Sequence, residues 1–169
     1  MRVVIPDAVF AEATRVEGAP GASELIEWVA RNDDLVSIRP TEVGQDQLQR
    51  LRDGRPIRGM GVAAALEVLA TTAEYHPSRH LFLIFEDKDL EKRKVILPER
   101  AYAVTTGDWL RLAERQGLIQ SADQVLDRAA ERGRSVERLR TIGSRQVALD
   151  AAERSLRAAK RRNGEGLGD

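Results

Sequence analysis

The segment GMGVAAALEVLA, residues 59–70, decides the fold, because it joins a glycine turn to a helix-like run with almost no polar side chain. A helix that is apolar on every side belongs inside a domain. Glycines before a helix also suggest a loop that cradles a phosphate. However, the segment lacks the third glycine of a dinucleotide motif, the lysine of a P-loop and a preceding strand. We therefore interpret it as a central helix.

Short apolar runs on both sides of this helix predict a parallel sheet. They occupy residues 2–6, 35–38, 80–85 and 101–104. The run at 80–85, HLFLIF, is continuous, as in strands of parallel sheets that are covered on both faces. Helical patterns lie after Pro6 and at residues 23–32, 41–52, 107–116 and 121–132. Thr41 is the expected N-cap of the helix at 41–52, and Ser121 that of the helix at 121–132. This alternation predicts a doubly wound α/β fold, in which ligands bind at the carboxyl ends of strands.

Composition narrows the class of protein. A chain of 169 residues with 42% hydrophobic residues is long enough for one domain with a core. Its 27 basic and 27 acidic residues balance, so the whole chain has no charge bias toward nucleic acid or membrane. Cysteine is absent, which excludes disulfides, zinc-thiolate sites and thiol catalysis. No apolar run approaches the ~20 residues of a membrane span. We expect no signal peptide, since the N-terminus lacks its charged and apolar segments. We expect a soluble, cytoplasmic protein with no membrane partner.

The C-terminal part differs in charge from the rest. Residues 134–162 hold nine arginines and lysines against three acids. This surplus predicts a separate unit at residues 135–169, a basic helical extension that ends in the frayed tail NGEGLGD. The basic side chains either contact phosphates or are simply solvated. The absence of interleaved aromatic residues favours the second interpretation.

The segment FEDKD, residues 85–89, places three candidate metal ligands at the end of the HLFLIF strand. Glu86, Asp87 and Asp89 repel one another unless a cation neutralises them, and Mg²⁺ or Mn²⁺ prefers such oxygen ligands. The alternative is a solvated acidic turn, neutralised by the lysines and arginine that follow.

Other candidate residues stand alone in the sequence. Glu12 lies among apolar neighbours on the first helix, so it is either partly buried and in need of a partner or an ordinary surface glutamate. His76 and His80 flank a proline in a loop, where a structural or solvent-facing role is expected. Trp28 and Trp109 lie on amphipathic helices and are expected in the core.

Four segments resemble, in the same order, parts of PIN domains. VVIPDAVFAEATR (3–15) is similar to the second strand and the helix that bears an active-site glutamate, and GMGVAAALEVLA resembles the central helix. LIFEDKDL (83–90) is similar to the strand whose end carries the last aspartate. The segment from AVTTGDWL to AERGR (103–134) resembles the closing strand and helices of PIN proteins from toxin-antitoxin loci. The resemblance spans about residues 2–134.

This resemblance implies a Rossmann-like three-layer α/β/α domain over residues 1–134, with the extension after it. It implies an endoribonuclease that hydrolyses RNA with Mg²⁺ or Mn²⁺, and, as in VapC-type toxins, a homodimer inhibited by a small antitoxin protein. Glu12 matches the second acid of the family and Asp87 the last, with Asp89 and Glu86 as nearby helpers. The implied catalytic residues are Glu12, Asp87 and Asp89. The metal ions would activate a water molecule and hold the scissile phosphate.

Two positions depart from the PIN pattern. The family begins with a strand that ends in aspartate, and that strand would lie upstream of Arg2. The third acid, expected directly after Gly61, is replaced by Val62. Truncation, decay to an impaired enzyme, and retention of the fold for binding all explain these departures. A non-catalytic module that binds protein or RNA is therefore the alternative function, and a regulator that uses the basic C-terminal helix is a third.

Overall fold

The computed structural model describes residues 2–16, 19–55, 59–86 and 96–140, and these residues form a mixed α/β protein. The chain divides into two compact units, unit 1 at Met1–Tyr75 and unit 2 at His76–Asp169. This division falls inside the predicted domain 1–134. The boundary expected after residue 134 stays a prediction, because most of the extension lies outside the described residues.

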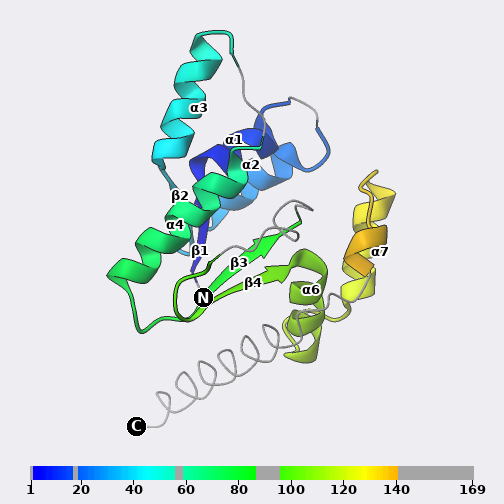
Figure 1. Cartoon of the computed structure of the whole chain (residues 1–169). Helices are drawn as coiled ribbons and strands as arrows, with labels where there is room; N and C mark the ends of the chain where they lie inside the picture. The colour runs from blue at the N-terminus through cyan, green and yellow to red at the C-terminus, as the bar shows by residue number, and fades with distance from the viewer. Residues whose placement is uncertain (1, 17–18, 56–58, 87–95, 141–169) are drawn as a thin grey trace. The chain divides into compact units, whose positions relative to one another are not determined.

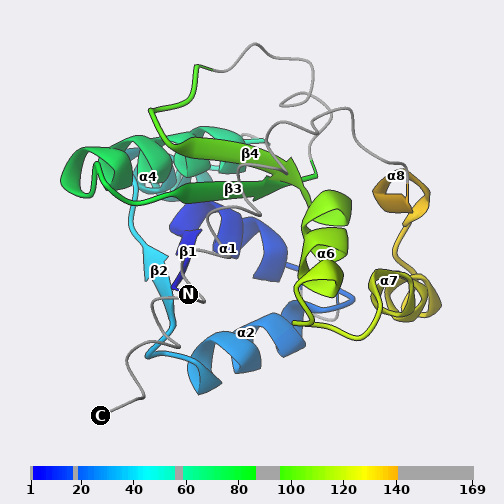
Figure 2. The same cartoon turned by 90° about the horizontal axis from the view of Figure 1, so that it is seen from below.

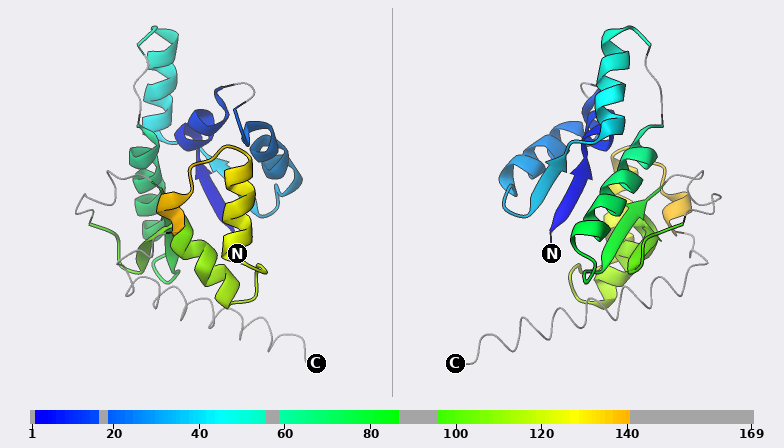
Figure 3. Two further views of the ribbon diagram at one scale, coloured as in Figure 1. Left: turned by 90° about the vertical axis from the view of Figure 1, so that its right-hand side faces the viewer. Right: turned by 60° about the vertical axis from the view of Figure 1, so that its left-hand side comes forward.

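Unit 1 contains a two-stranded parallel sheet. Strands β1 (Val3–Pro6) and β2 (Val36–Arg39) pair in register along their whole length; Figure 1 and the right panel of Figure 3 show them side by side. Parallel neighbours need a crossover connection, and helices α1 (Asp7–Thr14) and α2 (Ala22–Arg31) supply it. Each of these elements confirms a pattern predicted from the sequence.

Two further helices complete unit 1. Helix α3 (Glu42–Arg52) begins after Thr41, whose hydroxyl accepts a hydrogen bond of 2.8 Å from the Gly44 N–H. This contact confirms the predicted N-cap. Helix α4 (Gly61–Tyr75) contains the segment quoted first, and α1 packs against both α3 and α4. Figure 1 shows α1 and α4 near β1.

The apolar core of unit 1 consists of alanines, valines and one leucine. Its buried members are Ala8, Ala22, Val36, Ala64, Val68 and Leu69. Only one side of α4 belongs to this core, because Ala63 and Ala70 are exposed. The prediction that α4 is buried on every side is therefore wrong. An alanine methyl group is so small that exposing it costs little, and apolar atoms are common on protein surfaces.

Unit 2 contains a second two-stranded parallel sheet, β3 (Leu81–Phe85) and β4 (Ala101–Thr105), again paired in register. Figure 2 shows the two strands side by side, with α6 (Thr106–Arg115) following β4. Helix α7 (Ala122–Glu131) comes next. The buried apolar residues are Phe85, Ala101, Ala103, Val104, Leu112, Ala113, Ala122, Leu126 and Val136. Both strands and both helices confirm the predicted pattern.

One expectation for β3 is not met. The continuous apolar run predicts a strand covered on both faces, yet the Ile84 side chain is 43% exposed. Among the described residues β3 pairs with β4 alone and packs against α6, so it has less cover than a central strand in a large sheet. The prediction of complete cover is therefore wrong.

A short helix, α8 (Glu137–Arg140), begins the predicted extension and packs against α6 and α7. Its backbone comes so near to α6 that a Cβ atom added at Gly107 would lie 2.0 Å from the Leu139 carbonyl oxygen. Only a residue without a side chain allows this approach.

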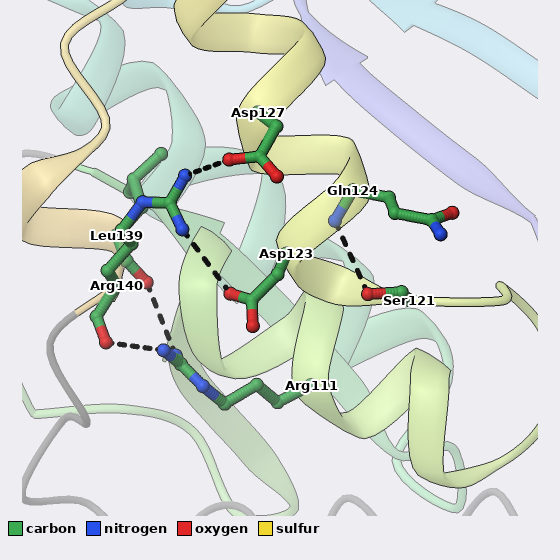
Figure 4. Close-up of polar contacts among 7 residues, drawn as sticks. All are labelled: Arg111, Ser121, Asp123, Gln124, Asp127, Leu139 and Arg140. Atoms are coloured by element: carbon green, nitrogen blue, oxygen red, sulfur yellow. Dashed lines mark hydrogen bonds and ion pairs between the residues drawn. The ribbon is translucent and has the colours of Figure 1, made fainter.

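Arginine side chains hold α8 in place (Figure 4). Arg111 of α6 donates hydrogen bonds to the carbonyl oxygens of Leu139 and Arg140. A guanidinium group has several N–H donors in one plane, so it can bond two carbonyl oxygens at once. Arg140 in turn forms ion pairs with Asp123 and Asp127 of α7. The first turn of the basic extension is therefore bound to both neighbouring helices.

Candidate functional site

Glu12, the candidate acid of unit 1, lies between two other helices. Its Oε1 accepts a hydrogen bond of 3.4 Å from the side-chain amide of Gln47 on α3. Its Oε2 faces the start of α4, where a Cβ atom added at Gly61 would lie 3.1 Å away. Glu12 is exposed, which agrees with the surface glutamate of the two alternatives and not with partial burial, and it has a hydrogen-bond partner. Its carboxylate therefore remains open to solvent beside the glycine that begins α4.

Val62 follows Gly61 in the first turn of α4 and is half-buried. Its methyl groups occupy the position at which the PIN resemblance expects a carboxylate. Because an aliphatic side chain has no oxygen, Val62 offers nothing to a hard cation.

The acids expected after β3 are described only in part. Glu86 directly follows the strand, and its carboxylate forms an ion pair with Arg134. Asp87 and Asp89 lie outside the described residues. Of the four candidate acids, the structure therefore describes Glu12 in unit 1 and Glu86 in unit 2. Among residues 2–16, 19–55, 59–86 and 96–140, no three histidines, aspartates or glutamates gather as a metal site needs. A hard cation requires several oxygen ligands, so the described residues alone do not make up a Mg²⁺ or Mn²⁺ site.

A polar cluster at the N-terminus of α3 is absent from the sequence predictions. The Thr41 hydroxyl donates to Asp7 Oδ1 at 2.6 Å, and the Thr41 N–H donates to Asp7 Oδ2 at 3.2 Å. The Ala8 N–H also donates to Asp7 Oδ1, at 2.8 Å. The sequence marks Thr41 as a cap and places a helix start just after Pro6, where Asp7 follows. No pattern shows that residues 34 positions apart contact each other.

Helix α4 adds a second acid to this cluster. The Glu67 carboxylate accepts hydrogen bonds from the N–H groups of Glu42, at 2.8 Å, and Val43, at 3.3 Å. The first turn of a helix has free N–H groups and a positive dipole end, which a carboxylate stabilises. Asp7 and Glu67 therefore join three helices, and each carboxylate is satisfied by protein donors.

The histidines and tryptophans have different surroundings. Trp28 is 41% exposed, so the prediction that it lies in the core is wrong. Trp109 is half-buried and packs near Phe82. His80 is exposed and stacks on Tyr102.

Within the described part of the chain, every helix is too short or too polar to cross a membrane. Comparison with protein-family models, with curated proteins and with solved structures finds no match to this chain.

Proposed function

We propose that this chain is a PIN-like metal-dependent endoribonuclease of the VapC type, the toxin of a toxin-antitoxin pair. Glu12 carries the proposal, because its exposed carboxylate lies beside the glycine that begins α4. The order of elements also supports it. A parallel strand leads into the helix with Glu12, α4 begins at a glycine, and acids follow the parallel strand β3. The proposed architecture is a Rossmann-like three-layer α/β/α domain.

In this proposal Glu12, Asp87 and Asp89 hold Mg²⁺ or Mn²⁺, and Glu86 assists them. Glu86 is the weakest of the four, because Arg134 already neutralises its charge. A bound metal ion would supply an activated water molecule and stabilise the charge that develops on the phosphate. The partners are single-stranded or structured RNA, a small antitoxin protein and a second copy of the chain in a cytoplasmic homodimer.

Cleavage of a fluorescently labelled RNA by the purified full chain tests this proposal. We expect cleavage with Mn²⁺, none with EDTA, and a loss in Glu12→Gln. Removing an outer hydrogen-bond partner of a metal ligand costs about 10–100-fold, and removing the ligand itself should cost no less. Glu74→Gln is the matched control, because Glu74 is an exposed glutamate of α4 in the same unit. Equal cleavage by the two variants would remove Glu12 from the site.

A second candidate function is a non-catalytic module that binds protein or RNA. Val62 at an acid position and the ion pair between Glu86 and Arg134 favour it, because both reduce the negative charge available to a cation. Calorimetric titration with Mn²⁺ separates the two candidates. Under the nuclease proposal, Val62→Glu strengthens Mn²⁺ binding and the uncharged Val62→Gln does not. If both variants only lower the thermal midpoint, Val62 is ordinary packing and the non-catalytic function stands.

A further inference from the structure

Four aromatic rings form a continuous row in unit 2. The His80 and Tyr102 rings stack with centroids 5.9 Å apart and planes 8° apart. Tyr102 stacks on Phe82 at 5.5 Å and 24°, and Phe82 contacts Trp109 at 5.9 Å. The whole chain has only two tryptophans, two tyrosines, three phenylalanines and two histidines. A large share of its rings is therefore gathered in one place.

The strand register explains this row. Phe82 of β3 lies directly opposite Tyr102 of β4, and residues paired in register project to the same face of a sheet. Trp109 comes from the first part of α6, and His80 directly precedes β3. Three of the rings are half-buried, whereas His80 is exposed. The row thus runs from α6 across the sheet and ends at a ring that is open to solvent.

Two exposed arginines lie next to the open end of the row. Arg79 precedes His80 in sequence, and Arg100 precedes the first residue of β4. The Arg100 guanidinium donates to the Ser78 carbonyl oxygen at 3.3 Å, and the Leu81 N–H donates to the Arg100 carbonyl oxygen. Arg100 is therefore held beside the start of β3, and Arg79 directly precedes His80 in the chain. The neighbouring Glu99 offsets one of their charges, so the local balance remains positive.

Arg100 has a backbone φ of 62°, the only positive value at a non-glycine position among the described residues. An L-residue pays a cost in this left-handed conformation, and glycine or asparagine would serve the turn better. Such strain is often kept where the side chain has a function. The strain at Arg100 therefore agrees with a role for its guanidinium group, which an ordinary turn does not require.

We propose that this end of unit 2 binds single-stranded nucleic acid. An unpaired base continues the row by stacking on His80, and Arg79 and Arg100 contact the phosphates on either side. Aromatic rings combined with basic groups bind single strands without sequence preference, because every base has a flat face. This site shares no residue with the proposed nuclease site and needs neither a metal ion nor cleavage, and it would also serve the RNA-binding candidate.

Fluorescence anisotropy with a labelled ten-nucleotide oligouridine RNA tests this inference on the full chain. EDTA is present throughout, so binding is measured without metal-dependent cleavage. A non-specific electrostatic contribution predicts a Kd of about 1–100 µM at physiological salt. Losing one stacking ring costs about fivefold or more in affinity, which is the effect expected for His80→Ala. His80→Phe keeps a ring and should bind like the wild type.

His76→Ala is the matched control, because His76 is the other histidine of the chain and is also exposed in the same unit. Replacing Arg79 and Arg100 together by alanine should flatten the salt dependence by about 0.7 for each lost phosphate contact. Arg31→Ala, which removes an exposed arginine of unit 1, should leave the salt dependence unchanged.

Two results would overturn the inference: no binding by the wild type across this concentration range, or equal affinity of His80→Ala and His76→Ala. The second result would mean that RNA binds elsewhere, for example on the basic extension. Failure of the nuclease proposal is a separate observation, because it appears as an absence of cleavage with Mn²⁺ while binding in EDTA is intact. Thermal melting of His80→Ala confirms that a loss of affinity does not come from unfolding.

Discussion

The Thr41 hydroxyl donates a hydrogen bond of 2.6 Å to the Asp7 carboxylate and thereby joins the start of α1 to the start of α3. The same hydroxyl oxygen accepts the Gly44 N–H at 2.8 Å. Thr41 is only 2% exposed, so water does not easily replace these contacts. One hydroxyl group therefore caps α3 and also satisfies a carboxylate of α1.

Thr41→Val removes both hydrogen bonds and keeps the shape of the side chain. The lost N-cap costs about 0.5–2 kcal/mol, and a partly buried carboxylate that loses a donor adds to this loss. We expect the free energy of unfolding, measured with urea, to fall by about 1–3 kcal/mol.

The control for this change is Thr14→Val. The Thr14 hydroxyl donates to the Phe10 carbonyl oxygen of its own helix, at 2.8 Å. That carbonyl stays within α1, and such local bonds add little to helix stability. If Thr14→Val and Thr41→Val destabilise equally, the link between α1 and α3 does not contribute to stability.

Gly44, in the first turn of α3, has no room for a side chain. A Cβ atom there would lie 2.2 Å from Asp7 Oδ1, so Gly44→Ala must displace the Asp7 side chain. In an unconstrained helix, glycine to alanine stabilises by about 1 kcal/mol, whereas overpacking costs about 1–3 kcal/mol. We expect a net loss of stability by urea unfolding. In the double variant with Asp7→Ala, the added methyl group meets no carboxylate, and its cost should shrink or reverse. Strictly additive effects of the two changes would contradict this contact.

Gly107→Ala tests the attachment of α8. The added methyl group would meet the Leu139 carbonyl oxygen at 2.0 Å, and backbone cannot yield as a flexible side chain does. We expect α8 to separate from α6, so that hydrogen exchange speeds up at the N–H groups of Leu139 and Arg140, which bond to Val136. Amides of α7 serve as the internal reference. Unchanged exchange in α8 would show that its backbone does not lie against Gly107.

Acid should weaken the contacts of Glu137, the first residue of α8. The Ser135 hydroxyl donates to the Glu137 carboxylate at 2.6 Å and, with backbone N–H groups and the Arg140 charge, lowers the pKa of Glu137 below 4.5. Because the pKa of Glu137 is lower in the folded state than in the unfolded state, its contacts stabilise the fold at pH values above 4.5. This stabilisation is lost as the pH falls through the folded-state pKa. We expect NMR titration to place the Glu137 midpoint below 4.5, and Ser135→Ala to move it upward. If Ser135→Ala leaves the Glu137 midpoint unchanged, Ser135 is not the cause of the lowered pKa.

Local patterns predicted the elements of the fold well. The parallel pairing of both sheets agrees with the alternation of strands and helices, and Thr41 and Ser121 cap the predicted helices. These features depend on neighbours within a few positions, which periodicity and cap chemistry describe directly. Burial was predicted less well, as Trp28 and Ile84 show, because exposure depends on what covers a side chain.

The candidate site was predictable only as a set of residue types. Glu12 was identified from its helix and Glu86 from the end of a strand. Their partners in the structure are Gln47 and Arg134, which lie in other parts of the chain. Nothing in the sequence indicates that these residues contact the two acids. Asp87 and Asp89 remain sequence predictions.

The sequence by itself determined where strands and helices form, because backbone preference and the apolar period are local properties. Only the tertiary structure decided that Asp7 meets Thr41, that Gly44 and Gly107 cannot carry a side chain, and that His80 ends a row of rings. These relationships join positions far apart in the chain. They arise when packed helices and paired strands bring distant residues to one point, and no local pattern records that outcome.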